Sequence, residues 1–77
     1  MKRRGKIVPK YAKWLKKMRI QRGFTQDFIA DHVHVARETV SKWERAKARP
    51  SNEIVQKLFD LYNCSEAEKL SYIDPPK

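Results

Sequence analysis

Residues 23–44 read GFTQDFIADHVHVARETVSKWE, and the expected fold follows from this stretch. Thr25 belongs to the residue types whose side chain caps a helix, so it predicts a helix over about residues 26–33. Residues 34–35 leave room for only a short turn. A second helix is predicted over about residues 36–45. This stretch therefore predicts two short helices joined by a tight turn.

The second of these helices has two unlike faces. Val40 and Trp43 lie three residues apart and form its apolar side, so we assign Trp43 to the core rather than to stacking on a base. The opposite side carries the polar residues Arg37, Glu38, Ser41 and Lys42. A helix with such an exposed polar face can enter the major groove of duplex DNA.

Another helix is predicted on the N-terminal side of this pair. Pro9 suits its first position, where a missing N–H costs nothing, and Gly23 suits a left-handed end. Apolar residues recur between them at three- and four-residue steps, at Tyr11, Trp14, Leu15 and Met18. We expect Trp14, Phe24, Phe28 and Ile29 to lie in the core.

Two further helices are predicted on the C-terminal side. Ser51 caps the first, whose apolar stripe is Ile54, Val55, Leu58, Leu61 and Tyr62. Ser65 and Glu68 form a capping box that begins a short fifth helix, ending at about residue 73. The expected fold class is all-α: a compact five-helix domain over residues 9–73. Residues 1–8 would form a flexible basic arm and residues 74–77 a tail.

The charge of the chain points to a polyanionic partner. Its 77 residues, enough for one domain, carry 18 Lys and Arg against 9 Asp and Glu, a formal net charge of +9. Such an excess usually indicates nucleic acid, and sometimes an anionic membrane. Ten of the basic residues lie within residues 2–22, where no acid occurs. The arm, with Lys2, Arg3 and Arg4, would contact the DNA backbone or, alternatively, only keep the chain in solution.

Several classes of function find no support in the sequence. Cys64 is the only cysteine, which excludes an internal disulfide, suits a reducing cytoplasm and suggests a small core filler. His32 and His34 do not share a helix face, so we expect no metal and no cofactor. No nucleophile–base pair suggests an enzyme. No apolar run approaches the ~20 residues of a membrane span, so we expect a cytoplasmic protein.

Two stretches resemble the Cro/C1-type helix-turn-helix domain. LKKMRIQRGFTQDFIA, residues 15–30, resembles its first half, and VARETVSKWERAKARPS, residues 35–51, its second half. Gly-x-Thr-Gln, a small Ala four residues after the Gln, and Ser-x-Trp-Glu occur together at the family's spacings. The resemblance covers about residues 13–70. It implies a lambda-repressor-like fold and sequence-specific binding of double-stranded DNA.

Four positions depart from the family pattern. His34 stands where the inter-helix turn usually has Gly, and Ala46 where Gly usually follows the second helix. Ala36 replaces the usual Ser or Thr cap, and Phe28 replaces the usual Glu, so the capping box is lost there. A non-Gly residue in the left-handed region and a lost cap each cost about 1 kcal/mol. We expect the same fold at lower stability.

The resemblance also implies roles for individual residues. Arg37, Glu38 and Lys42 would read base edges, with Ala36 and Ser41 as helpers, although Glu38 is equally explained as a solvated surface acid. The DNA backbone would be held by Thr25, Gln26, Arg45, Lys47 and Arg49, besides the arm. Arg19 and Glu44 would form a charged pair that ties the first helix to the third, or else be two unrelated surface charges.

The function that these expectations support is that of a small transcriptional regulator. Its size suggests a repressor or controller of the phage, plasmid, toxin–antitoxin or restriction–modification type. We expect a weak homodimer on an inverted-repeat operator, formed through Leu58, Leu61, Tyr62, Leu70 and Tyr72. One alternative is a protein-interaction module that binds a toxin or a larger repressor. Another is a peripheral membrane binder using residues 2–22, which Gly5, Pro9 and the resemblance argue against.

Overall fold

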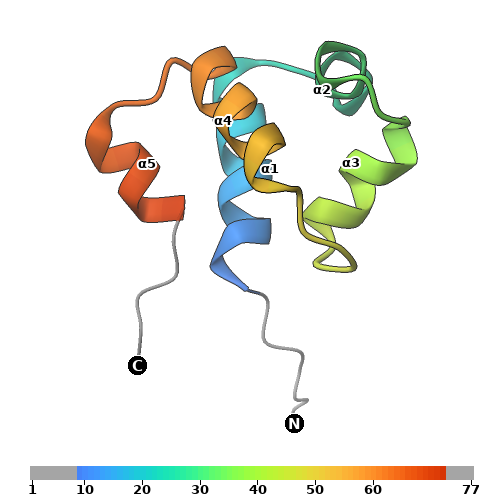
Figure 1. Ribbon diagram of the computed structural model, residues 1–77, viewed down its shortest axis with the longest axis horizontal. Coiled ribbons are helices and arrows are strands. Elements are labelled where there is room, and N and C mark those ends of the chain that lie inside the picture. The colour runs from blue at the N-terminus through green and yellow to red at the C-terminus, as the bar shows by residue number, and fades with distance from the viewer. Residues whose placement is uncertain (1–8, 73–77) are drawn as a thin grey trace, which may run out of the picture.

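The computed structural model describes residues 9–72, which form five α-helices and no strand within that range (Figure 1). The helices are α1 (Lys10–Arg22), α2 (Gln26–Val33), α3 (Arg37–Glu44), α4 (Asn52–Leu61) and α5 (Glu66–Tyr72). The all-α five-helix fold is confirmed. The helix expected over residues 26–33 has the predicted bounds. The helix expected over residues 36–45 is α3, one residue shorter at each end because Ala36 and Arg45 are its caps. The expected arm, the tail and residue 73 lie outside the described residues.

The helices begin where side chains cap them. The Thr25 hydroxyl accepts from the Phe28 N–H at 3.0 Å, and the Ser51 hydroxyl accepts from the Ile54 N–H at 3.3 Å. At α5 the capping box is reciprocal. Its Ser65 hydroxyl accepts from the Glu68 N–H at 3.2 Å, while the Glu68 carboxylate accepts from the Ser65 N–H at 3.0 Å. These bonds satisfy N–H groups that a helix start would otherwise leave without a partner.

Left-handed residues end the helices or follow them. Gly23 ends α1 at φ 78°, as predicted from its place in the sequence. His34 and Ala46 adopt φ 64° and 63° at the two positions where the family usually has Gly, and Asn63 adopts φ 53°. These three residues are therefore left-handed although they carry a Cβ, a conformation that favours glycine.

The central helix of the domain is α1. In Figure 1 the pair α2–α3 lies on one side of it and α5 on the other, and α1 packs against both α3 and α5. Trp14 faces α5: its indole N–H donates to the Glu68 carbonyl at 3.0 Å and to the Ser71 hydroxyl at 2.9 Å. Its ring meets those of Phe59 and Tyr72 edge to face at 5.7 and 5.2 Å between centroids. Trp14 and Trp43 are both buried, as expected.

The expectation that Phe28 lies in the core is wrong. The inner face of α2 consists of Ile29, Ala30 and Val33, so the side chain of Phe28 points outward and is 46% exposed. It stacks on Phe24 at 4.7 Å and on His32 at 6.3 Å between ring centroids. Of the residues expected in the core beside it, Ile29 is buried and Phe24 is half-buried.

The apolar surface expected for a dimer is mostly internal. Leu58, Tyr62 and Tyr72 are buried, because α4 and α5 fold back onto α1 around Trp14. Leu61 is half-buried, and Leu70 is 66% exposed. Much of the surface that the sequence suggested for a partner therefore builds this domain's own core.

None of the helices between residues 9 and 72 combines the length and the apolar character that crossing a membrane requires. The same residues include no group of three or more side chains placed to hold a metal ion. His32 and His34 are both exposed. Cys64 is half-buried and packs against the core, in keeping with its expected role as a filler.

Candidate nucleic-acid interface

The outer face of α3 is polar, and its inner face is anchored in the core. Val40 and Trp43 are buried against the rest of the domain, whereas Arg37, Glu38 and Lys42 are exposed. α3 packs against both α2 and α1, so its orientation is set from two sides. The structure therefore presents three of the expected base-reading residues together on one exposed surface.

Two of these side chains are held by charged neighbours. The Arg45 guanidinium donates to the Glu38 carboxylate at 2.7 Å and to the Ser41 hydroxyl at 3.1 Å. The Arg37 Nε atom lies 3.6 Å from the Asp27 carboxylate of α2. Both ion pairs are exposed and add little to stability, but they orient the side chains along the face. From the sequence, Arg45 is expected to contact phosphates only. In the structure it also contacts Glu38 and Ser41, two of the residues expected at base edges.

The start of α2 lies beside the end of α3. The Gln26 side-chain amide donates to the Glu44 carboxylate at 3.1 Å, and Thr25 caps the helix directly before it. The N–H groups in the first turn of a helix, with the positive end of its dipole, favour an anion such as a phosphate. The two residues expected at the DNA backbone here are therefore positioned by the cap and by Glu44.

Glu44 joins α1, α2 and α3. Arg19 donates to its carboxylate twice, from Nε at 2.7 Å and from Nη2 at 3.0 Å, in a bidentate pair. The side chains are only 14% and 5% exposed, and this hydrogen bond with Glu44 raises the pKa of Arg19. Arg19 also donates to the Phe24 carbonyl at 3.0 Å. The structure thus brings together the pair that the resemblance implied and adds Gln26 to it.

The basic loop after α3 is held against α1. The Arg49 guanidinium lies 4.4 Å from the centre of the Tyr11 ring, a cation–π contact, and the Tyr11 hydroxyl donates to the Ala48 carbonyl at 3.1 Å. Lys47 and Arg49 are exposed beside the end of α3. The loop therefore extends the polar face of α3. Lys2, Arg3 and Arg4, also expected at the backbone, lie outside the described residues.

Arg22 has a structural role that the sequence pattern did not reveal. Its position continues the apolar spacing of α1, yet its guanidinium donates twice to the Tyr62 carbonyl, at 3.1 and 2.9 Å. It also pairs with the Glu68 carboxylate at 3.3 Å. These contacts tie the end of α1 to the turn between α4 and α5. No local signal predicts them, because the partners are 40 and 46 residues away.

Comparison with known proteins points in the same direction as the geometry. The family model described as Helix-turn-helix matches residues 15–69, which is more than two thirds of the chain and includes α2, α3 and α4 entirely. No significant match is found among curated proteins or among solved structures.

Proposed function

Because the chain belongs to the Cro/C1-type helix-turn-helix family of DNA-binding proteins, we propose that it recognises a specific sequence in double-stranded DNA and regulates transcription. The observation that carries this proposal is the outer face of α3. That face is polar and exposed, while Val40 and Trp43 on the opposite face are buried. A helix held in this way can lie in the major groove without giving up its packing.

Arg37 is the strongest candidate for reading a base. It is the first residue of α3 and is exposed, and a guanidinium can bond O6 and N7 of guanine together. Such a fork discriminates against other bases by about 1–3 kcal/mol. Glu38, oriented by Arg45, can accept from N4 of cytosine, and Lys42 reaches a further base or a phosphate. Ser41 and Ala36 contribute at the edges of this surface.

The remaining polar residues would fix the position of the domain on the duplex. Thr25 and Gln26 lie at the start of α2, beside the end of α3, and Lys47 and Arg49 lie in the loop that follows α3. Contacts from such residues to phosphates set the register of the protein but carry no sequence information. The loss of one of them is therefore expected to weaken binding to all sequences alike.

A random-site selection with the purified chain tests the proposal. The wild-type chain should enrich one motif. The Arg37→Ala chain should lose preference at one position in each half-site, while its melting temperature and its affinity for random duplex stay nearly unchanged. Lys47→Ala serves as the matched control, because it removes a charge from the loop and should preserve the motif while lowering all affinities. An unaltered motif from Arg37→Ala would remove Arg37 from base reading.

For the assembly, we propose a weak homodimer that forms on DNA at an inverted repeat. Leu70 is the largely exposed leucine of α5, with Leu61 half-buried on α4, and a two-fold pair would cover both. Half-sites should then lie about one helical turn apart. Leu70→Ser should weaken the binding of the second protomer to the duplex. The measurement is the number of chains bound per duplex at saturation. A selected motif with a single half bound by one chain contradicts this assembly.

The regulatory class follows from analogy alone. By analogy with the family, we propose that the chain is a repressor, or a controller of the phage, plasmid, toxin–antitoxin or restriction–modification type. The test is a reporter gene placed behind the selected motif. Its expression should fall when the chain is produced and recover with Arg37→Ala.

One observation favours a second function, the binding of a protein partner such as a toxin or a larger repressor. Phe28 is 46% exposed on the outer face of α2, stacked between Phe24 and His32. An exposed aromatic ring of this kind is a frequent anchor at protein interfaces. If the free chain enriches no DNA motif in the selection, this function becomes the better account of the chain.

A further inference from the structure

The exposed side of α1 carries a lysine-rich stripe that the proposed base and backbone contacts do not use. Lys16 and Lys17 each lie three or four residues from both Lys13 and Ile20, so the four side chains share one broad face of the helix. All four are exposed, and Ile20 is 57% exposed. The opposite face of α1 is buried in the core, so this stripe is free to meet a partner.

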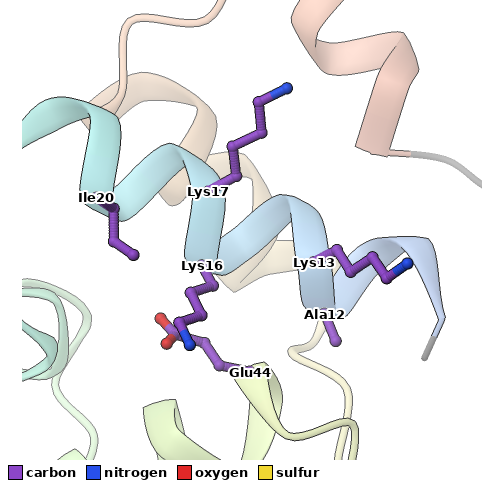
Figure 2. Close-up of a pocket in the computed structure, with 6 residues that line it drawn as sticks. All are labelled: Ala12, Lys13, Lys16, Lys17, Ile20 and Glu44. Carbon is purple, nitrogen blue, oxygen red and sulfur yellow. The ribbon is translucent and has the colours of Figure 1, made fainter. Parts of the chain in front are cut away.

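The stripe borders a hollow of about 410 Å³. The hollow is lined by Ala12, Lys13, Lys16, Lys17, Ile20 and Glu44 (Figure 2). In Figure 2, Lys16 extends towards Glu44, whereas Lys13 and Lys17 extend away from it. We call this the lysine hollow. It lies where α1 meets the C-terminal end of α3.

The net charge of the lysine hollow is positive. Glu44 is the single acid among its lining residues, and that carboxylate is occupied by Arg19 and Gln26 and is only 5% exposed. No ion pair engages Lys13, Lys16 or Lys17 within the described part of the chain, and α1 contains no acid. Three lysine ammonium groups thus remain available to an anion.

The lysine hollow also lies beside the surface proposed for DNA. Glu44, which lines the hollow, is the last residue of α3 and accepts a hydrogen bond from Gln26 at the start of α2. A helix in the major groove has a phosphate strand on each side of it, so a strand that borders the end of α3 passes next to the hollow. A backbone strand offers anionic phosphates for the lysines and apolar deoxyribose faces for the exposed side chain of Ile20.

We propose that the lysine hollow is a further DNA-backbone site, in which α1 holds the phosphodiester strand flanking the groove read by α3. This inference rests on the proposed function and extends the DNA contact to a helix outside the helix-turn-helix pair. Lys16, closest to the end of α3, contacts one phosphate, and Lys13 contacts the next along α1. Ile20, about one turn beyond Lys16 along α1, covers the sugar next to the phosphate at Lys16.

The test compares the salt dependence of binding for Lys13→Ala, Lys16→Ala and Lys57→Ala, using the selected duplex and a random duplex. Lys57 is an exposed lysine of α4 that does not line the hollow, so its loss changes the net charge equally. In a plot of log binding constant against log salt concentration, each hollow variant should flatten the slope by about 0.9. Each should also weaken binding to both duplexes by the same factor. Lys57→Ala should leave the slope as it is, and Lys16→Arg should restore it.

The outcomes separate this inference from the proposed function. If the wild-type chain enriches a motif but the hollow variants keep the wild-type slope, the site is overturned and sequence-specific binding stands. A slope flattened equally in Lys57→Ala also overturns it, because net charge alone would then explain the effect. If the wild-type chain binds no duplex, the proposed function fails first. Circular dichroism of each variant should match the wild type, since all the substituted side chains are exposed.

Discussion

At the scale of single residues, Glu44 is the position that connects three helices. Its carboxylate accepts two hydrogen bonds from Arg19 and one from Gln26, so one side chain holds α1, α2 and α3 together. It also forms a wall of the lysine hollow. The angle of α3 and the position of Gln26 therefore share a single electrostatic anchor.

We predict that Glu44→Ala lowers the free energy of unfolding by about 3–5 kcal/mol, because Arg19 is left largely buried without its partner. Denaturant unfolding measures the change. Replacing both partners, as in Arg19→Met with Glu44→Leu, should cost less than the single substitution. Glu53→Ala, which removes an exposed acid of α4, is the control and should change stability by less than about 0.5 kcal/mol. A small loss from Glu44→Ala would mean that the pair contributes little.

At the scale of elements, the helix ends combine good caps with strained turns. Thr25 and Ser51 cap α2 and α4, but Ala36 begins α3 without a side-chain hydrogen bond. His34 and Ala46, on either side of α3, are left-handed although they carry a Cβ. The orientation of α3 is therefore set by packing and by Glu44 more than by its own ends.

We predict that Ala46→Gly stabilises the domain by about 1 kcal/mol, because Gly adopts φ 63° without the Cβ clash. For a domain of this size, that gain raises the melting temperature by about 4–8 °C. Ala48→Gly in the same loop is the control. Ala48 is not among the left-handed residues of the described chain, so there the change should destabilise. Equal effects from the two substitutions would argue against strain at Ala46.

The docking of α5 should depend on pH through Glu68. The N–H of Ser65, with Arg22 nearby, holds the pKa of the Glu68 carboxyl below its ordinary value. A lowered pKa in the folded chain stabilises the fold above about pH 4.5, and this contribution is lost as the pH falls through the folded value. We therefore expect the Trp14 indole N–H resonance, which reports contact with α5, to shift in acid.

Glu68→Gln should weaken this acid dependence, because the side chain no longer changes its charge. Glu66→Gln is the matched control, since Glu66 is an exposed acid of the same helix turn. An acid shift that survives in Glu68→Gln at full size would place its origin elsewhere.

At the scale of the whole molecule, basic residues gather on α1 and in the loop that follows α3. The lysine hollow lies on α1, Arg45 caps α3, and Lys47 and Arg49 follow it. In the sequence, residues 2–22, which include the three lysines of the hollow, carry ten basic residues and no acid. Such a distribution favours association with DNA and should make binding depend strongly on salt.

We predict that removing residues 1–6 lowers affinity and flattens the salt slope, by about 0.9 for each phosphate that this segment neutralises. The motif from the random-site selection should stay the same, because phosphate contacts carry no sequence information. Removing residues 74–77, which carry one acid and one lysine, is the control and should leave the slope unchanged. A truncated chain with the wild-type slope would show that residues 1–6 do not touch DNA.

Features that depend on neighbours within about four residues could be predicted from the order of residues alone. Helix periodicity, the Thr25 and Ser51 caps, the capping box of α5 and the left-handed Gly23 all follow from such local interactions. They explain why the helix bounds agree with the structure to within a residue or two. The family could also be predicted from the order of residues, because its motifs lie within short stretches of sequence.

Which apolar residues stay exposed, and which distant polar groups meet, could be learned only from the folded chain. Phe28 faces outward and Tyr72 inward because of how α2 and α5 pack. The spacing of apolar residues within each helix does not predict this packing. Gln26 meets Glu44 across 18 residues and Arg22 meets the Tyr62 carbonyl across 40. The lysine hollow likewise exists only where α1 meets the end of α3. Burial and long-range bonding depend on how helices pack in space, and that arrangement has no counterpart in the spacing along the chain.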